Sequence, residues 1–379
     1  MPRAQFAEYD AASPALRNGC TENTRKAILD KLQQWASDNM ATKVYWLNGM
    51  AGTGKKTIAY SFSQILDDQN SLGGTFFSSH LRVDTSDVHC IIPTISLQLA
   101  ARGYIPCLAH HVLDVVEANP DCKSWRIQKQ FLNFIVKPLK GVEVIPVIIL
   151  DALDECSDQH LVAELLSEIL KHNKSLPVKF FISSRPEVEL KETFDYSSGH
   201  SNFILHEVEK EIVKADIELY IKAQFKHNMP PQSEVDRLVH MAGSLFIYAA
   251  TVCKYIAQKG GPNMPQRLSD VVNLTLETTS GLTHPLDVLY ERILDAAYQY
   301  TNQRERSNIG LVLQVIVYAY NPLSMTAISS LMQISVQETV AALSSLHSLI
   351  YIPKDPGGPI SIFHASFYDF MSKIGRAHV

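Results

Sequence analysis

A glycine-rich stretch followed by two lysines is the part of the sequence with the clearest chemical meaning. Residues 49–56 read Gly-Met-Ala-Gly-Thr-Gly-Lys-Lys and match the pattern G-x-x-x-x-G-K. Such a loop can wrap a polyphosphate, because its successive backbone N–H groups point inward and glycine permits close approaches that a Cβ would block. Lys55 then supplies a positive charge for the β- and γ-phosphates. We therefore predict a P-loop that binds a nucleotide.

The segments on either side of this loop have the order that a P-loop requires. Residues 44–47 form an apolar run typical of a buried strand, and residues 57–66 have the pattern of a helix. The first turn of that helix adds unpaired N–H groups and the positive end of the helix dipole. The alternative is a flexible turn before a surface helix. We predict that the nucleotide contacts Gly49, Ala51, Gly52, Thr53, Gly54, Lys55, Lys56 and Thr57.

The loop departs from its pattern at position 56. A Ser or Thr is expected there, because its hydroxyl ligates Mg²⁺, but the residue is Lys56. Thr57 cannot simply replace it, since it is rotated by roughly 100° around the helix. Either Lys56 points to solvent and leaves the metal one ligand short, or its charge partly takes the place of the metal. The sequence thus predicts ATP or ADP as the bound cofactor and leaves Mg²⁺ and hydrolysis open.

A second group of chemically relevant residues follows an almost continuous apolar run at residues 144–150. The run ends in Asp151, and Asp154 and Glu155 come directly after it. Open α/β sheets bind ligands at the carboxyl ends of their strands, so Asp151 is placed to hold Mg²⁺ as a Walker B acid. Glu155, or less favourably Asp154, would orient the attacking water. The alternative is a helix cap followed by first-turn acids.

The remaining strand patterns complete a fold of the α/β class. Residues 180–184 form another buried run, and Arg185 follows it, where a guanidinium can contact a γ-phosphate. The alternative is a plain surface arginine. Shorter runs at 74–78 and 203–205 alternate with helical patterns, which predicts a parallel sheet with helices on both faces.

The two ends of the chain differ from this alternating region. Residues 1–19 look like a loose lead-in, and a helix follows at 24–36 with Arg25 as a solvated charge near its start. A nucleotide contact is the alternative for Arg25. From residue 212 the strands stop and helical patterns dominate, with a break expected at residues 260–262, Gly-Gly-Pro. Two short helices before apolar runs at 349–352 and 360–363 predict a winged helix. The predicted division is a lead-in at 1–22, a nucleotide-binding domain at 23–207, a helical domain at 208–300, a winged helix at 301–373 and a tail at 374–379. The tail continues no pattern and is either native or non-native.

Composition limits the classes of protein to which the chain can belong. Its 379 residues are 46% hydrophobic and 19% charged, as in ordinary globular proteins, and the net charge of −5 does not favour nucleic-acid binding. The six cysteines form no C-x-x-C pair, which argues for reduced thiols in the cytoplasm. No signal peptide or membrane span is recognisable.

The motifs together resemble a known family. Gly-Met-Ala-Gly-Thr-Gly-Lys, Asp-Ala-Leu-Asp-Glu-Cys, Ser-Ser-Arg-Pro-Glu, Leu-Phe-Ile-Tyr-Ala-Ala at 245–250 and His-Ala-Ser-Phe at 364–367 occur in order. This order is similar to that of the fungal NACHT ATPases of the signal-transducing STAND class, close to the nephrocystin-3-like N-terminal type. The likeness runs from about residue 24 to residue 370.

The resemblance implies a switch in which a helical domain and a winged helix close over ADP. Exchange for ATP then opens the protein and allows homo-oligomerisation towards an unknown effector. It implies that Gly52, Gly54 and Lys55 bind phosphates, that Arg185 is the sensor arginine and that His364 touches the β-phosphate of ADP. An ordinary histidine beside a hairpin is the alternative for His364. The effector segment and the sensor repeats of the family are not recognisable, so we expect a fragment or a short paralogue.

Three functions are compatible with these observations. The favoured one is a nucleotide switch of a NOD-like receptor in signalling, non-self recognition or programmed cell death, with slow or impaired hydrolysis. The alternative is a degenerate P-loop scaffold that binds nucleotide weakly and has no catalysis, which Lys56 makes credible. A small-molecule or nucleoside kinase is disfavoured, because nearly half of the chain offers no evident acceptor site.

Overall fold

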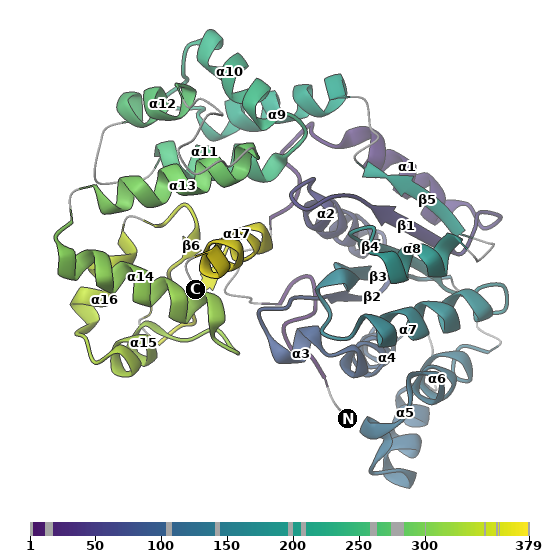
Figure 1. Cartoon of the computed structure of the whole chain (residues 1–379). Coiled ribbons are helices and arrows are strands. Elements are labelled where there is room, and N and C mark those ends of the chain that lie inside the picture. The colour runs from purple at the N-terminus through teal and green to yellow at the C-terminus, as the bar shows by residue number, and fades with distance from the viewer. Residues whose placement is uncertain are drawn as a thin grey trace.

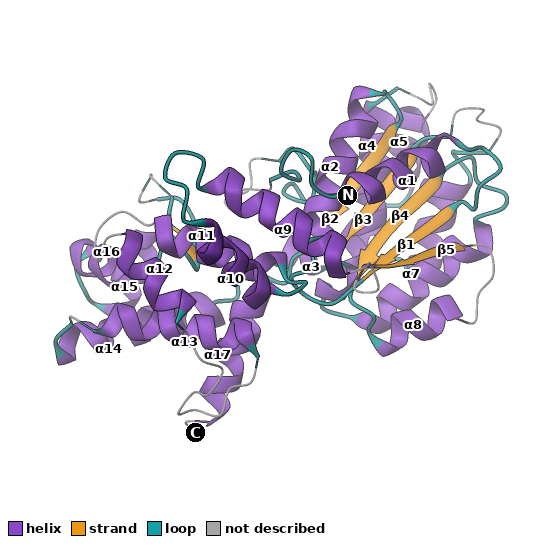
Figure 2. Ribbon diagram, turned by 90° about the horizontal axis from the view of Figure 1, so that it is seen from above, coloured by secondary structure: helices purple, strands orange, loops and turns teal. Residues whose placement is uncertain are grey.

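A five-stranded parallel sheet forms the centre of the first half of the chain (Figures 1 and 2). The computed structural model describes residues 3–11, 18–103, 108–140, 145–195, 200–205, 210–257, 264–273, 284–299, 301–344, 346–353, 355 and 357–377. The strands are β1 (Val44–Asn48), β2 (Leu72–Phe77), β3 (Val147–Asp151), β4 (Lys179–Ser184) and β5 (His200–Ile204). Their order is β2-β3-β4-β1-β5, and each neighbouring pair is parallel. The chain therefore has the predicted α/β architecture of a P-loop NTPase.

Helices cover both faces of this sheet because successive strand residues point to opposite sides. Tyr45 and Leu47 pack with the helices α1 (Lys26–Ser37) and α2 (Lys55–Asp68). Trp46 packs on the opposite face. The helices of that face are α4 (Ile91–Ala101), α5 (Leu108–Ala118), α6 (Ile127–Phe131), α7 (Gln159–His172) and α8 (Val188–Asp195). Figure 2 shows the sheet between these two helical layers.

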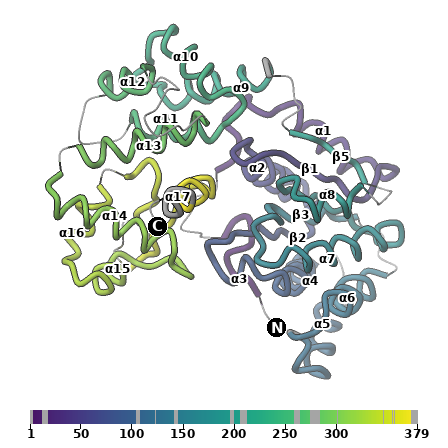
Figure 3. The backbone as a smooth tube through the Cα atoms, in the orientation of Figure 1, coloured from purple at the N-terminus to yellow at the C-terminus, as the bar shows by residue number. Residues whose placement is uncertain are grey.

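The first described residues do not form the loose lead-in that the sequence predicts. Ala7 O accepts a hydrogen bond of 2.8 Å from the backbone N–H of Phe77, and Tyr9 N donates to Thr75 Oγ1 at 2.9 Å. Residues 3–11 therefore run along β2 and cover the edge of the sheet. Figure 3 shows this stretch beside β2 and the short helix α3 (Val83–Ser86). The interpretation as a loose segment is wrong for these residues, because the unpaired groups of an edge strand bind them.

The second half of the chain is helical and ends in a small hairpin and a last helix. The helices are α9 (Lys210–Gln224), α10 (Gln232–Ala242), α11 (Phe246–Ala257), α12 (Met264–Val272), α13 (Pro285–Tyr298), α14 (Gln303–Tyr318), α15 (Met325–Met332), α16 (Val336–Ser344) and α17 (Ala365–Ala377). The hairpin pairs β6 (Ile350–Tyr351) with β7 (Ser361–Ile362) in antiparallel fashion. One apolar core runs from Val213 to Phe370 and joins all of these elements.

The last helix extends further than the sequence predicts. Residues 374–377 continue α17, so the expectation that the tail follows no pattern is wrong for them. The expected break at residues 260–262 lies outside the described residues. The boundaries drawn at residues 207 and 300 stay predictions. In the described part of the chain, none of the helices combines the length and the apolar composition needed to cross a bilayer.

A buried lysine joins α1 to the sheet. Lys179, the first residue of β4, is fully buried, and its Nζ donates to Trp35 O at 2.5 Å, Ala36 O at 3.0 Å and Asp38 O at 2.7 Å. These carbonyls lie at the end of α1, where no further helical N–H is available. We expect Lys179→Met to lower the free energy of unfolding by about 2–4 kcal/mol, because Trp35 O and Ala36 O lose their donor and Asp38 O keeps only its bond from Ala41 N. Urea denaturation measures this, with the exposed Lys174→Met as control; an unchanged midpoint would contradict it.

Candidate nucleotide-binding site

The glycine-rich loop lies where the sequence predicts it, between the end of β1 and the start of α2. Gly49 N donates to Ser184 O at 3.3 Å, which ties the loop to β4. Gly52 and Gly54 have φ angles of 77° and 96°, in the left-handed region that side chains with a Cβ rarely adopt. No side chain caps α2, and no acid lies in its first turn. The free N–H groups of this turn therefore make an anion-binding end.

Lys55 lies over the loop and contacts it directly. Its Nζ donates to Gly49 O at 2.5 Å and to Met50 O at 3.1 Å. Burial lowers the pKa of Lys55, while nearby Asp154 and Asp151 oppose the shift. Thr53 is buried and its hydroxyl donates to Met50 O at 2.8 Å, so the loop is internally fixed. Ala51 lies in the loop beside Gly52, and Thr57 lies half-buried in the first turn of α2.

Asp151, the predicted Walker B residue, is fully buried at the end of β3. Ser183 Oγ donates to its Oδ1 at 2.5 Å, and Oδ2 is buried without a hydrogen-bond partner. Burial raises the pKa of Asp151, and the charge of Lys56 opposes that shift. Ser183 was not among the site residues predicted from the sequence. The pairing of Leu150 with Ile182 in neighbouring strands places it beside Asp151, and that register cannot be read from the sequence.

Lys56 points towards the acidic cluster. Its Nζ lies 3.7 Å from Glu155 Oε1, although 47% of the side chain remains exposed. On the other side of the same carboxylate, His80 Nδ1 lies 3.3 Å from Oε2. Burial alone would raise the pKa of Glu155, but Lys56 and His80 hold it below its ordinary value. This geometry favours the orientation in which the Lys56 ammonium supplies a positive charge inside the site over the one in which it points to solvent.

The residues around Asp151 fit a Mg²⁺ ion poorly. The buried Oδ2 of Asp151 has no hydrogen-bond partner and could bind a cation. However, Lys56 occupies the position of the hydroxyl ligand, and its ammonium has no lone pair with which to bind a metal. Within the described residues, no group of three or more His, Cys, Asp or Glu side chains is arranged to hold a metal. We therefore derive no step that passes through a metal ion.

Asp154 and Arg185 form a pair at the same edge of the sheet. Asp154 Oδ1 accepts from the backbone N–H of Arg185 at 2.9 Å, and its Oδ2 lies 3.1 Å from Arg185 Nε. Burial and the neighbouring Glu155 raise the pKa of Asp154. Arg185 thus contacts both oxygens of Asp154, just as Lys56 and His80 contact both oxygens of Glu155, so pairing alone does not separate the two candidate bases. The catalytic roles of all three residues remain predictions.

His364 lies between β7 and α17. The backbone N–H of Ser366 donates to its Nδ1 at 3.1 Å, and Ser366 Oγ lies 2.7 Å from the same atom. Nδ1 is therefore an acceptor, and the proton of the neutral ring is on Nε2. Burial lowers the pKa of His364 to about 3, which keeps the ring neutral. The charges of Glu155 and Lys56 also influence this pKa, so His364 belongs to the same electrostatic cluster.

The residues before α1 and the start of α11 also contact the P-loop. Arg25 is only 6% exposed, its Nη2 donates to Thr53 O at 2.7 Å, and its guanidinium lies 4.4 Å from the ring centroid of Phe246. The interpretation of Arg25 as a solvated charge is therefore wrong. Ile247 N donates to Gly52 O at 3.2 Å, and a Cβ on Gly52 would lie 2.2 Å from Ile247 Cγ2. The P-loop is thus in direct contact with the helical half of the chain.

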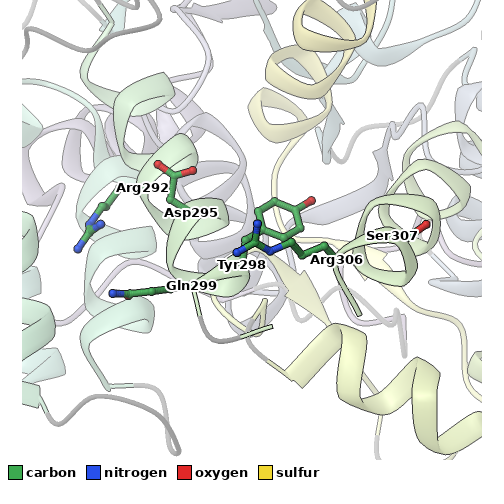
Figure 4. Close-up of a pocket in the computed structure, with 6 residues that line it drawn as sticks. All are labelled: Arg292, Asp295, Tyr298, Gln299, Arg306 and Ser307. Atoms are coloured by element: carbon green, nitrogen blue, oxygen red, sulfur yellow. The ribbon is translucent and has the colours of Figure 1, made fainter. Parts of the chain in front are cut away.

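A separate open hollow lies between α13 and α14 (Figure 4). Its volume is about 770 Å³. None of the predicted site residues lies among those that line it, which are Arg292, Asp295, Tyr298, Gln299, Arg306 and Ser307. The candidate nucleotide site at the edge of the sheet is therefore a different region of the molecule.

Residues 23–185 match the family model described as Nephrocystin 3, N-terminal. This segment includes the P-loop, the predicted Walker B residue Asp151 and Arg185, and it covers less than half of the chain. No curated protein matches the chain significantly. The match agrees with the nephrocystin-3-like resemblance of the motifs and with the P-loop fold. The fungal and NACHT assignments stay predictions.

Several solved structures are similar to the chain over most of its length. A STAND protein with a tetratricopeptide repeat sensor from Pyrococcus horikoshii has 13% identity and a TM-score of 0.49. The similarity covers 94% of this chain but only 44% of that protein. Cdc6p from Pyrobaculum aerophilum has 12% identity and a TM-score of 0.42 over 97% of both chains. Drosophila ORC, in its DNA-bound structure, has 12% identity and a TM-score of 0.41 over 96% of this chain and 89% of that one.

Proposed function

We propose that this chain is a nucleotide-dependent conformational switch that binds ATP or ADP and hydrolyses ATP slowly or not at all. The observation that supports it most is the direct contact between the P-loop and the helical half, through Ile247 N and Gly52 O. A phosphate that moves the loop must also disturb this contact, so nucleotide state and the position of the helices are coupled. The family resemblance supports a fungal NOD-like receptor in non-self recognition or cell death.

His364 has a specific place in this proposal. It would close the site as a neutral N–H donor to the β-phosphate of ADP, since its proton is on Nε2. The helical domain at 208–300 and the winged helix at 301–373 would move together on exchange for ATP. We also propose that the ATP-bound form assembles into homo-oligomers. A nucleic-acid partner is not part of the proposal, because the net charge of the chain is −5.

We expect His364→Ala to speed the release of ADP by about threefold to tenfold, because one neutral hydrogen bond to the phosphate is lost. His364→Gln is the matched control, since its amide can place an N–H near the position of Nε2 and should restore slow release. Stopped-flow measurement with a fluorescent ADP analogue follows the rate. Equal release rates for the native chain and the alanine variant would contradict the closing role of His364.

A degenerate scaffold remains the second candidate, and one observation favours it. Glu155, the candidate base, lies between Lys56 and His80 and is paired with both. A carboxylate held in this way is a poor base, because its positive neighbours lower its proton affinity. The two candidates differ in nucleotide affinity: a switch requires tight, state-dependent binding, whereas a scaffold tolerates weak binding.

A further inference from the structure

Two consecutive residues of α17 contact side chains at the carboxyl edge of the sheet. Asp369 Oδ2 lies 3.4 Å from Nη1 of Arg185, the residue after β4. The ring centroid of Tyr368 lies 5.2 Å from that of His80, which follows β2. Figure 1 shows α17 in the middle of the molecule, between the sheet and the helices α13 and α14. The last helix of the chain is therefore docked on the residues around the nucleotide site.

Arg185 is held by two carboxylates that differ in burial. Asp154 has a side chain that is 7% exposed and binds both the backbone N–H and Nε of Arg185. Asp369 has a side chain that is 43% exposed and reaches only Nη1. A buried pair is costly to break, whereas an exposed pair contributes little and exchanges readily. The bond to Asp369 is therefore the one that a competing anion can replace.

The γ-phosphate of a bound triphosphate is an anion that would lie near Arg185. Burial lowers the pKa of Lys55, and the positive charge of Arg185 also lowers it, so the two side chains lie near each other. Lys55 is the residue expected at the β- and γ-phosphates. Phosphate oxygens form strong charge-assisted bonds with a guanidinium. The same negative charge would repel the carboxylate of Asp369. A diphosphate lacks this group and leaves the pair between Arg185 and Asp369 in place.

We propose that Asp369 makes the site sensitive to the γ-phosphate, by holding Nη1 of Arg185 when a diphosphate is bound and losing it to the terminal phosphate of a triphosphate. Asp369 is then a specificity-determining residue that favours diphosphate, and its release loosens the docking of α17. This inference rests on the proposed nucleotide switch. It adds a residue of the helical half, outside the P-loop and Walker motifs, that discriminates between the two nucleotides.

The variant Asp369→Asn tests the inference, because it removes the charge and keeps the size of the side chain. Calorimetry gives the affinities for ADP and for a non-hydrolysable ATP analogue in the same buffer. We expect the affinity for the analogue to rise about threefold to tenfold, and that for ADP to change less than about twofold. The matched control is Asp295→Asn, an exposed carboxylate in the hollow of Figure 4, for which both affinities should stay unchanged.

Hydrogen exchange of residues 365–372 gives a second readout on the native chain. We expect faster exchange with the ATP analogue than with ADP, and a smaller difference in Asp369→Asn. If the variant binds ADP as the native chain does but its ratio of affinities is unchanged, the inference is overturned and the nucleotide switch is unaffected. If the native chain binds neither nucleotide, the proposed function fails and this inference fails with it.

Discussion

Replacing Lys55 by alanine is expected to weaken the binding of ADP by about tenfold to a hundredfold, the range for losing a hydrogen bond to a charged group. The ammonium of Lys55 bonds to the loop carbonyls of Gly49 and Met50 and lies at the place where the β-phosphate would be held. Without it, the backbone N–H groups of the loop and of α2 would have to bind the phosphates alone. Isothermal titration calorimetry measures the change directly.

The control for this experiment is Lys171→Ala. Lys171 is an exposed lysine of α7, with a side chain that is 64% exposed and paired with Glu168. The substitution removes the same charge at a position away from the site, so the affinity for ADP should not change. Circular dichroism establishes that both variants are folded. A folded Lys55→Ala chain that binds ADP as tightly as the native chain would show that the loop is not the phosphate site.

The second large effect is expected for Lys56→Ser. The native ammonium lies 3.7 Å from Glu155 and acts on Asp151. The serine would remove this charge and return a hydroxyl at the position where P-loop enzymes bind Mg²⁺. We expect nucleotide binding to become dependent on Mg²⁺ and single-turnover hydrolysis to rise about tenfold or more. Hydrolysis should also rise because Glu155 would lose one of its two positive neighbours and become a stronger base.

The double variant Lys56→Ser with Glu155→Gln separates these causes. It keeps the hydroxyl but removes the candidate base, so hydrolysis should fall back to the level of the native chain while Mg²⁺-dependent binding remains. Lys56→Ala supplies the other comparison, since it removes the charge without adding a hydroxyl. Brisk Mg²⁺-dependent hydrolysis by the native chain would contradict the account of Lys56.

The strands β1, β3 and β4 could be predicted from the sequence because they are buried on both faces. Each is largely apolar and ends in a polar residue, Asn48, Asp151 or Ser184, at the edge where ligands bind. The P-loop was equally readable, since its glycines at 52 and 54 are required by positive φ angles. These features are local, and a local pattern is sufficient to recognise them.

The parts that were missed depend on contacts between distant residues. Ser183 and His80 contact Asp151 and Glu155 only because strands 30 or more positions apart lie side by side. The sequence around Arg25 is that of a surface charge. In the structure Asp216 of α9 and Phe246 of α11 contact Arg25 and bury it. The last helix, α17, was not recognised as a separate element. Its role depends on its packing against the edge of the sheet, and the residue pattern of the helix alone does not predict that packing.

The most direct test is the affinity of the native chain for ADP, measured with Mg²⁺ and with EDTA. If Lys56 supplies the positive charge beside Asp151 and Glu155, ADP should bind in both conditions with affinities that agree within about a factor of two, because the charge is covalently part of the protein. A loss of tenfold or more in EDTA would mean that a metal ion carries that charge, and would contradict the account.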